Sequence, residues 1–241
     1  MAFDPEAAAR ALAESLRPLG TPERAAQEQR YLKSDLEFLG VTLPDLRRAV
    51  RAAAKGYPGL GRAEAIAWAG ALWREPVHER RAAAVEVLRL VTGDLAPGDL
   101  ELLERLIRDS GTWALVDPLA GDIAGAVALR DPAAWPRADG WAGDPDFWVR
   151  RSALLTLLAG IRAGRPDFER FERYAVPMLG EREFFIRKAI GWVLREASKR
   201  DPAWVAAWTA SRVAEMSGVT FREAVRRLPL EEATRLAALR G

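Results

Sequence analysis

Three segments of this chain share a ten-residue pattern, and this repetition constrains the fold more than any other feature. They read ERRAAAVEVL from Glu79, VRRSALLTLL from Val149 and IRKAIGWVLR from Ile186, and they align without gaps. Their starts lie 70 (149 − 79) and 37 (186 − 149) residues apart. The larger gap equals about two units of 35 residues, so one copy falls near residue 115. In each copy the apolar residues recur at the spacing of an amphipathic helix.

A period of this length, built from helix pairs, is typical of HEAT-like or armadillo-like solenoids, in which each pair buries its apolar face only against its neighbours. The sequence between the copies also reads as helix after helix, separated by Gly and Pro, with no convincing alternating strand. Helix starts are indicated at Asp4-Pro5 and Thr21-Pro22, and a third helix follows Leu43-Pro44. We therefore predict an all-α fold.

The segment Phe184 to Lys199 is predicted to form one helix with two distinct faces. At ~100° per residue, an apolar stripe gathers on one face. It comprises Ile186, Ile190, Val193, Leu194 and Ala197, and the other face carries Lys188, Trp192, Arg195 and Lys199. An aromatic ring among three cations suits an anionic partner that bears rings, such as nucleic acid. The alternative is that another helix covers Trp192 as ordinary core.

The repeat register places Arg81, Arg151 and Lys188 at equivalent positions. We expect their cations to line one continuous surface. The plainer alternative is that the solvent faces of solenoid helices are often basic whatever they bind.

Composition limits the functional classes that remain. The 36 basic residues nearly balance the 34 acidic ones, so attraction to DNA must come from clustering on one face. The chain has no cysteine and a single histidine, His78, which argues against disulfides, iron–sulfur clusters and the usual zinc sites; we expect no metal and no cofactor. His78 lies at an expected helix start and is interpreted as a surface or capping residue. No run of ~18 apolar residues is present and the first residues favour a helix cap over a leader, so we expect a soluble cytoplasmic protein.

A second unusual stretch, SGTWALVDPLAGDI, runs from Ser110 to Ile123. Trp113 and Asp117 lie four residues apart, which puts them on one face if a helix starts near Ser110 or Thr112. Pro118 disfavours helical geometry at Asp117, so the alternative is that Asp117 caps a helix beginning at Pro118. From spacing alone both readings stay open.

Four blocks together resemble the AlkD-type alkylpurine DNA glycosylases, bacterial DNA alkylation repair enzymes built from HEAT-like helix pairs. The blocks are YLKSDLEFLGVTLPDLRR from Tyr31, ALWREP from Ala71, TWALVDPLAGDI from Thr112 and FFIRKAIGWVLRE from Phe184. The resemblance implies a single domain over residues 1–241, shaped as a curved right-handed solenoid with a concave basic groove. It also implies a bacterial, nucleoid-associated protein that binds double-stranded DNA and hydrolyses the glycosidic bond of alkylated purines without flipping the lesion. A capped solenoid with a polar outer face is expected to be a monomer.

The same resemblance assigns roles to individual residues. The carboxylate at the lesion falls on Asp117, and the two tryptophans that contact the sugar fall on Trp113 and Trp192. A backbone-holding arginine falls on Arg151, and Tyr31 matches a residue of the groove. Arg150, beside Arg151, and Thr42 are also expected to contact DNA. Thr42 stands where the family has a glutamine-like side chain, Thr112 where it commonly has a tryptophan, and Pro118 where it has a small polar residue.

The basic stripe adds Lys188 and Arg195 as expected phosphate contacts. Lys188 could instead attack the sugar as a Schiff-base lysine, which would make the protein a lyase. Seven further tryptophans are expected to be core or inter-repeat packing. They are Trp68, Trp73, Trp135, Trp141, Trp148, Trp204 and Trp208.

The chemistry explains why so small a set could suffice. Alkylation at a ring nitrogen makes the purine cationic and hence a good leaving group, so the main demand is to stabilise positive charge developing on the deoxyribose. A carboxylate and two indole faces meet that demand. The rival hypothesis from another class is a solenoid that binds DNA or protein without chemistry; a carboxylate between two tryptophans in a basic groove would distinguish the enzyme from it.

Overall fold

The computed structural model describes residues 3–240, and every regular element in that range is helical. The one extended feature among these residues is an isolated parallel bridge between Glu37 and Val77. The predicted all-α fold is confirmed.

The chain divides into two compact units, one ending at Leu119 and the other beginning at Ala120. The first unit holds α1 (Pro5–Leu16), α2 (Pro22–Leu32), α3 (Leu43–Ala54), α4 (Arg62–Trp73), α5 (His78–Leu90), α6 (Leu100–Asp109) and α7 (Trp113–Asp117). The second holds α8 (Gly125–Arg130), α9 (Trp135–Trp141), α10 (Phe147–Thr156), α11 (Leu158–Arg162), α12 (Phe168–Met178), α13 (Phe184–Ala197), α14 (Pro202–Arg212), α15 (Gly218–Val225) and α16 (Leu230–Arg240). A π-helix, Pro118–Ala124, spans the boundary, and short 3-10 turns cover Arg17–Leu19, Pro97–Asp99 and Pro132–Ala134.

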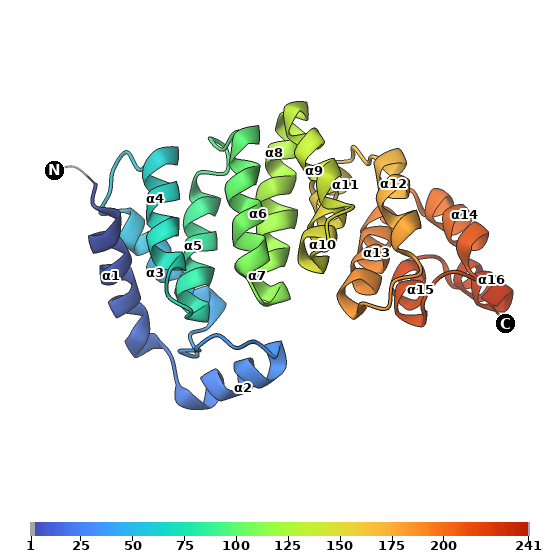
Figure 1. Ribbon diagram of the computed structural model, residues 1–241. Helices are drawn as coiled ribbons and strands as arrows, with labels where there is room; N and C mark the ends of the chain where they lie inside the picture. Colours follow the sequence, from blue (N-terminus) through green and yellow to red (C-terminus); the bar gives the residue numbers. More distant parts are fainter. Residues whose placement is uncertain (1–2, 241) are drawn as a thin grey trace. The chain divides into compact units, whose positions relative to one another are not determined.

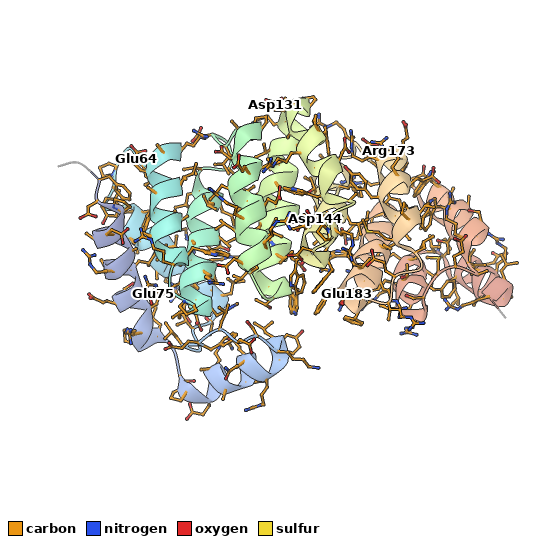
Figure 2. All side chains as sticks on the ribbon, in the orientation of Figure 1. Glu64, Glu75, Asp131, Asp144, Arg173 and Glu183 are labelled. Atoms are coloured by element: carbon orange, nitrogen blue, oxygen red, sulfur yellow. The ribbon has the colours of Figure 1, made fainter. Side chains whose placement is uncertain are left out.

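In the first unit, α4 and α5 form an antiparallel pair that packs against α1 and α3 (Figure 1). Figure 2 places Glu64 at one end of α4 and Glu75 just beyond the other. The predicted helix starts are confirmed, because Asp4 and Thr21 accept backbone N–H groups at the starts of α1 and α2. The third helix begins at Leu43, one residue before the proline.

In the second unit, α13 packs closely on α15. All five residues of the predicted apolar stripe of α13 are buried, which confirms the amphipathic assignment. A Cβ added at Gly191 would lie 2.8 Å from the Thr220 carbonyl oxygen, so a glycine is what lets the two backbones approach. Figure 2 shows Asp131 and Arg173 at one end of this unit's helices and Glu183 at the other.

The three repeat segments fall in α5, α10 and α13, and their first residues, Glu79, Val149 and Ile186, are all at most 1% exposed. The expected row of surface cations is wrong at two positions. Arg81 is 7% and Arg151 2% exposed, and only Lys188 is exposed. The buried arginines face inward because each donates to a backbone carbonyl, Arg81 to Asp109 at 2.5 Å and Arg151 to Phe185 at 2.6 Å.

Candidate functional site

The short helix α7 brings Trp113 and Asp117 together. Thr112 is its N-cap, with a hydroxyl that accepts the N–H of Ala114 at 3.4 Å. Trp113 and Asp117 therefore lie one turn apart on the same helix, and the alternative that Asp117 only caps a helix beginning at Pro118 is wrong. Helical winding does not stop at Pro118, because the chain continues directly from α7 as the π-helix Pro118–Ala124.

The two faces of α7 differ in burial. Leu115 and Val116 are at most 1% exposed, whereas Trp113 and Asp117 are half-buried. Helix α7 thus anchors itself by one face and presents the indole and the carboxylate at the edge of the other. This placement suits groups that act on a bound ligand, because the indole and the carboxylate are partly shielded from water and still accessible to the ligand.

Tyr31 stands against Trp113 although the two are far apart in sequence. Its ring meets the Trp113 ring edge to face, with centroids 6.0 Å apart and planes at 85°. Tyr31 is 71% exposed, so most of its ring is open to solvent. The structure therefore unites three of the predicted site residues of the first unit.

The start of α7 is fixed by a small polar cluster at the end of α6. The indole Nε1 of Trp73 donates to the Asp109 carboxylate at 2.8 Å, and Arg81 pairs with that carboxylate at 3.0 Å. The Arg81 guanidinium also lies 5.2 Å from the centre of the Trp73 ring. The chain then turns through Gly111, whose φ of +61° is a left-handed conformation that glycine accommodates.

In the second unit, α13 carries Trp192, Lys188 and Arg195 away from its buried stripe, as predicted. Trp192 is half-buried and so is not part of the fully buried core. Lys188 is exposed, with its Nζ 5.8 Å from the centre of the Phe184 ring. Arg195 is paired with Glu223 of α15, so its charge already has a partner within the protein.

Sequence reasoning missed an aromatic cluster at the starts of α10 and α13. The rings of Phe147, Trp148 and Phe185 lie 4.5 to 6.4 Å apart between centroids, and Phe184 adds a ring that is 49% exposed. The guanidinium of Arg151 sits 5.8 Å from the centre of the Phe185 ring. The signal was present in the repeat: two aromatic residues immediately precede both the second and the third copies.

Arg150 and Thr42, both expected at DNA, have their polar atoms engaged inside the protein. Arg150 forms a bidentate pair with Glu181, both distances being 2.9 Å, and it also donates to the Asp144 carbonyl at 2.6 Å. The hydrogen bond to Glu181 is the main reason that the pKa of Arg150 is raised. Thr42 caps α3 and donates to the Asp45 carboxylate at 2.6 Å. Their contact with DNA stays a prediction.

The interpretation of His78 as a surface residue needs correction. Its ring is half-buried and stacks on Phe38 at 4.8 Å, and burial lowers its pKa. Nδ1 has no hydrogen-bond partner among the described residues. Within residues 3–240 there is no group of three or more His, Cys, Asp or Glu side chains that could hold a metal ion. Nor is any helix of that range long and apolar enough to cross a membrane.

The remaining tryptophans follow the expectation of packing. Trp68, Trp73, Trp141 and Trp208 are at most 6% exposed. The others are half-buried and lie in aromatic or cation–π contacts. They are Trp135, Trp148 and Trp204.

Comparison with known proteins gives a consistent result. The family model described as DNA alkylation repair enzyme matches residues 12–228. Among solved structures, a predicted DNA alkylation repair enzyme from Enterococcus faecalis superposes with a TM-score of 0.78 at 22% identity, over 88% of this chain and 97% of that one. AlkD2 from Streptococcus mutans superposes with a TM-score of 0.54 at 18% identity, over 90% of this chain and 96% of that one. No curated protein matches by sequence.

Proposed function

Because the chain belongs to the DNA alkylation repair enzyme family, we propose that it is a monofunctional DNA glycosylase. Its substrate would be a cationic alkylated purine in duplex DNA, whose N-glycosidic bond it hydrolyses while the lesion stays in the stack. The observation that carries the proposal is the pairing of Trp113 and Asp117 on the half-exposed side of α7, with Tyr31 against the indole.

In this proposal Asp117 supplies the decisive charge. The alkylated base already carries a positive charge and leaves without a strong general acid, so the barrier lies in the cationic character that the deoxyribose gains. A carboxylate held at a partly dry surface stabilises that charge, and it can also orient the attacking water. The half-buried position of Asp117 fits this role because an exposed carboxylate would be screened and a buried one would be out of reach.

The tryptophans would contribute through their ring faces. An indole face close to a developing cation is worth ~0.5–2 kcal/mol. Trp113 and Trp192 are both half-buried, so each has a fixed base and an accessible edge. The proposal assigns both rings to the deoxyribose of the lesion.

Binding of the DNA backbone would rest first on exposed groups, namely Lys188, Tyr31 and the Phe184 ring. At 2% exposure, Arg151 supports the Phe185 ring and carbonyl, so we assign it the indirect task of setting the aromatic cluster. Arg150 is paired with Glu181 and Arg195 with Glu223. Each guanidinium would reach a phosphate only by dividing its donors between that phosphate and its present carboxylate. The proposal keeps a monomer that forms one curved, right-handed solenoid with a basic groove for the duplex.

The test is release of free methylpurine from methylated duplex DNA, with wild type and Asp117→Asn side by side and no metal added. We expect release by wild type and a loss of about 10²–10³ in single-turnover rate for the variant. Circular dichroism should show the same helical content for both. A variant that excises at the wild-type rate would remove Asp117 from the mechanism.

A second candidate is a helical scaffold that binds DNA or protein without chemistry. It is favoured by one observation, the internal use of Arg81, Arg150, Arg151 and Arg195, which leaves few of the expected cations for phosphates. If the protein is a scaffold on DNA, wild type and Asp117→Asn should both bind duplex DNA in the same assay, and neither should release methylpurine. In that case bulky purine adducts should be tried before the glycosylase is abandoned.

A further inference from the structure

Helix α2 is held in place without any core of its own. None of its residues is buried, whereas all the other helices of its unit bury two or more. Figure 1 shows α2 set apart from α4, α5 and α6, which stand side by side. Tyr31, near its end, nevertheless meets Trp113 in a defined edge-to-face contact. Something other than packing along α2 must therefore set the position of Tyr31.

Glu79 on α5 is the first candidate. Its repeat equivalents are Val149 and Ile186, both fully buried apolar residues, and Glu79 is buried to the same degree at 1% exposure. A buried carboxylate is costly unless hydrogen bonds compensate it. Here three backbone N–H groups do so, from Leu39 at 2.9 Å, Gly40 at 2.6 Å and Val41 at 3.1 Å.

The loop that Glu79 binds presses directly on the start of α2. Gly40 has a φ of +78°, and a Cβ there would lie 2.3 Å from the Thr21 carbonyl oxygen and 2.6 Å from the Ala25 nitrogen. On the other side, a Cβ at Gly20 would lie 2.0 Å from the Leu39 carbonyl oxygen. The carboxylate of Glu79 is thus linked through the loop's backbone to the first turn of α2.

Arg81, two residues further along α5, holds the other side of the contact. Its guanidinium pairs with the Asp109 carboxylate and donates to the Asp109 carbonyl, at the end of α6 just before α7 begins. Helix α5 also packs against α7 itself. One helix start therefore carries two buried charges, one tied to the segment that bears Tyr31 and one to the segment that bears Trp113.

We propose that Glu79 and Arg81 are paired positioning residues that together set Tyr31 against Trp113 for binding of duplex DNA. The inference rests on the proposed function, because it takes duplex DNA as the ligand of the Tyr31–Trp113 pair. Glu79 does not touch the substrate and acts through Tyr31 alone.

The test is a double-mutant cycle on duplex affinity with Glu79→Gln, Tyr31→Ala and the combined variant. Carboxamide replacement keeps the size of the side chain and weakens its hold on the three N–H groups. We expect Glu79→Gln to weaken affinity about fivefold or more in the Tyr31 background and less than about twofold when Tyr31 is already alanine. Equal effects in both backgrounds would overturn the proposal, because a merely structural role does not depend on Tyr31.

Hydrogen exchange gives a second readout that needs neither DNA nor activity. Glu79→Gln should speed exchange of the amides of α2 about tenfold and leave those of α6 unchanged. The matched control is Asp99→Asn, which weakens another buried carboxylate of the same unit, the partner of Arg62, and should leave α2 unchanged. If Glu79→Gln does not fold, Glu79→Asp, with its charge kept and its reach shortened, replaces it in both measurements.

The outcomes separate the two hypotheses. Failure of base release with intact coupling between Glu79 and Tyr31 would count against the glycosylase alone. Unchanged exchange of α2 in Glu79→Gln, with base release intact, would overturn the positioning role alone.

Discussion

At the scale of single residues, the role of a cationic side chain depends on whether it already has a hydrogen-bond partner within the protein. Three arginines donate to groups of the protein: Arg150 to Glu181, Arg151 to the Phe185 carbonyl and Arg195 to Glu223. Lys188, in contrast, is exposed. Arg151 and Lys188 occupy equivalent positions in the sequence repeat, yet Arg151 is buried and Lys188 is exposed. A cation that already bonds the protein stabilises the fold, and one that is free to bond phosphate governs how salt affects binding.

Lys188→Ala should therefore reduce the slope of log affinity for duplex DNA against log salt by about one, because one phosphate contact and its released counterion are lost. Arg170→Ala serves as the matched control, because Arg170 is half-buried and paired with Asp139. It should leave that slope unchanged and lower the free energy of unfolding by on the order of 1 kcal/mol, since Asp139 loses this partner. Fluorescence anisotropy at several salt concentrations gives the slope, and urea unfolding gives the stability; an unchanged slope in Lys188→Ala would contradict the assignment.

His78 predicts a pH dependence of stability. Burial lowers its pKa below the ordinary value of 6.5, so below pH 6.5 the unfolded chain takes up a proton that the folded chain refuses. Its contribution to stability is complete above pH 6.5 and is lost as the pH falls from there toward the lowered pKa. The melting temperature of wild type should drop more steeply between pH 7.5 and 5.5 than that of His78→Phe, which keeps the stacking on Phe38. Parallel curves would mean that His78 titrates normally.

At the scale of elements, the close approach of two helix backbones can depend on a single glycine that the sequence pattern does not single out. Glycines look alike in the sequence, but Gly191 of α13 lies against α15, whereas a Cβ at Gly70 of α4 would meet no atom within 4 Å beyond its own stretch of helix. The first must stay a glycine and the second has no such need.

Gly191→Ala should destabilise the protein by about 1–3 kcal/mol, because the new Cβ would lie 2.6 Å from the Glu223 Cβ and would push α13 from α15. Gly70→Ala, also within a helix, should instead be neutral or stabilise by about 0.5–1 kcal/mol by restricting the unfolded chain. Urea unfolding of the two variants checks both signs. A Gly191→Ala protein as stable as wild type would show that the two helices can part without cost.

The elements also show what sequence reasoning can and cannot reach. The buried stripe of α13 and the helix starts after Asp4 and Thr21 followed from local rules of spacing and capping. The contact between Tyr31 and Trp113 did not, because it joins two residues that lie far apart in the sequence and no local rule pairs them. The burial of Arg81 and Arg151 did not follow from such rules either. Periodicity assigns a residue to one face of a helix, but it does not show which neighbouring element covers that face.

At the scale of the whole molecule, composition already predicts how the chemistry should respond to reagents. The chain has no cysteine, and its one histidine is packed against a phenylalanine. The proposed reaction uses a carboxylate and indoles, which need neither a metal ion nor a thiol. The fold class followed from the repeat, whereas the division at Leu119 and Ala120 left no mark in composition or linker length.

Base release should consequently be unaffected by millimolar chelator, by thiol-modifying reagents and by reductant. The measurement is the methylpurine assay with and without each additive, with the Asp117→Asn protein as the inactive control. Loss of release with chelator, restored by one added divalent ion, would show a metal requirement and would contradict the proposed chemistry.

The wider winding that follows Asp117 has a consequence for how relatives are compared. A π-turn accommodates about one residue more than an α-turn of the same height, so Pro118–Ala124 behaves like a one-residue insertion in an otherwise regular helix. Deleting a single residue there, Ala120 for example, should restore α-winding within the segment. An alignment with a relative that has regular α-winding here would therefore need a one-residue gap in this segment.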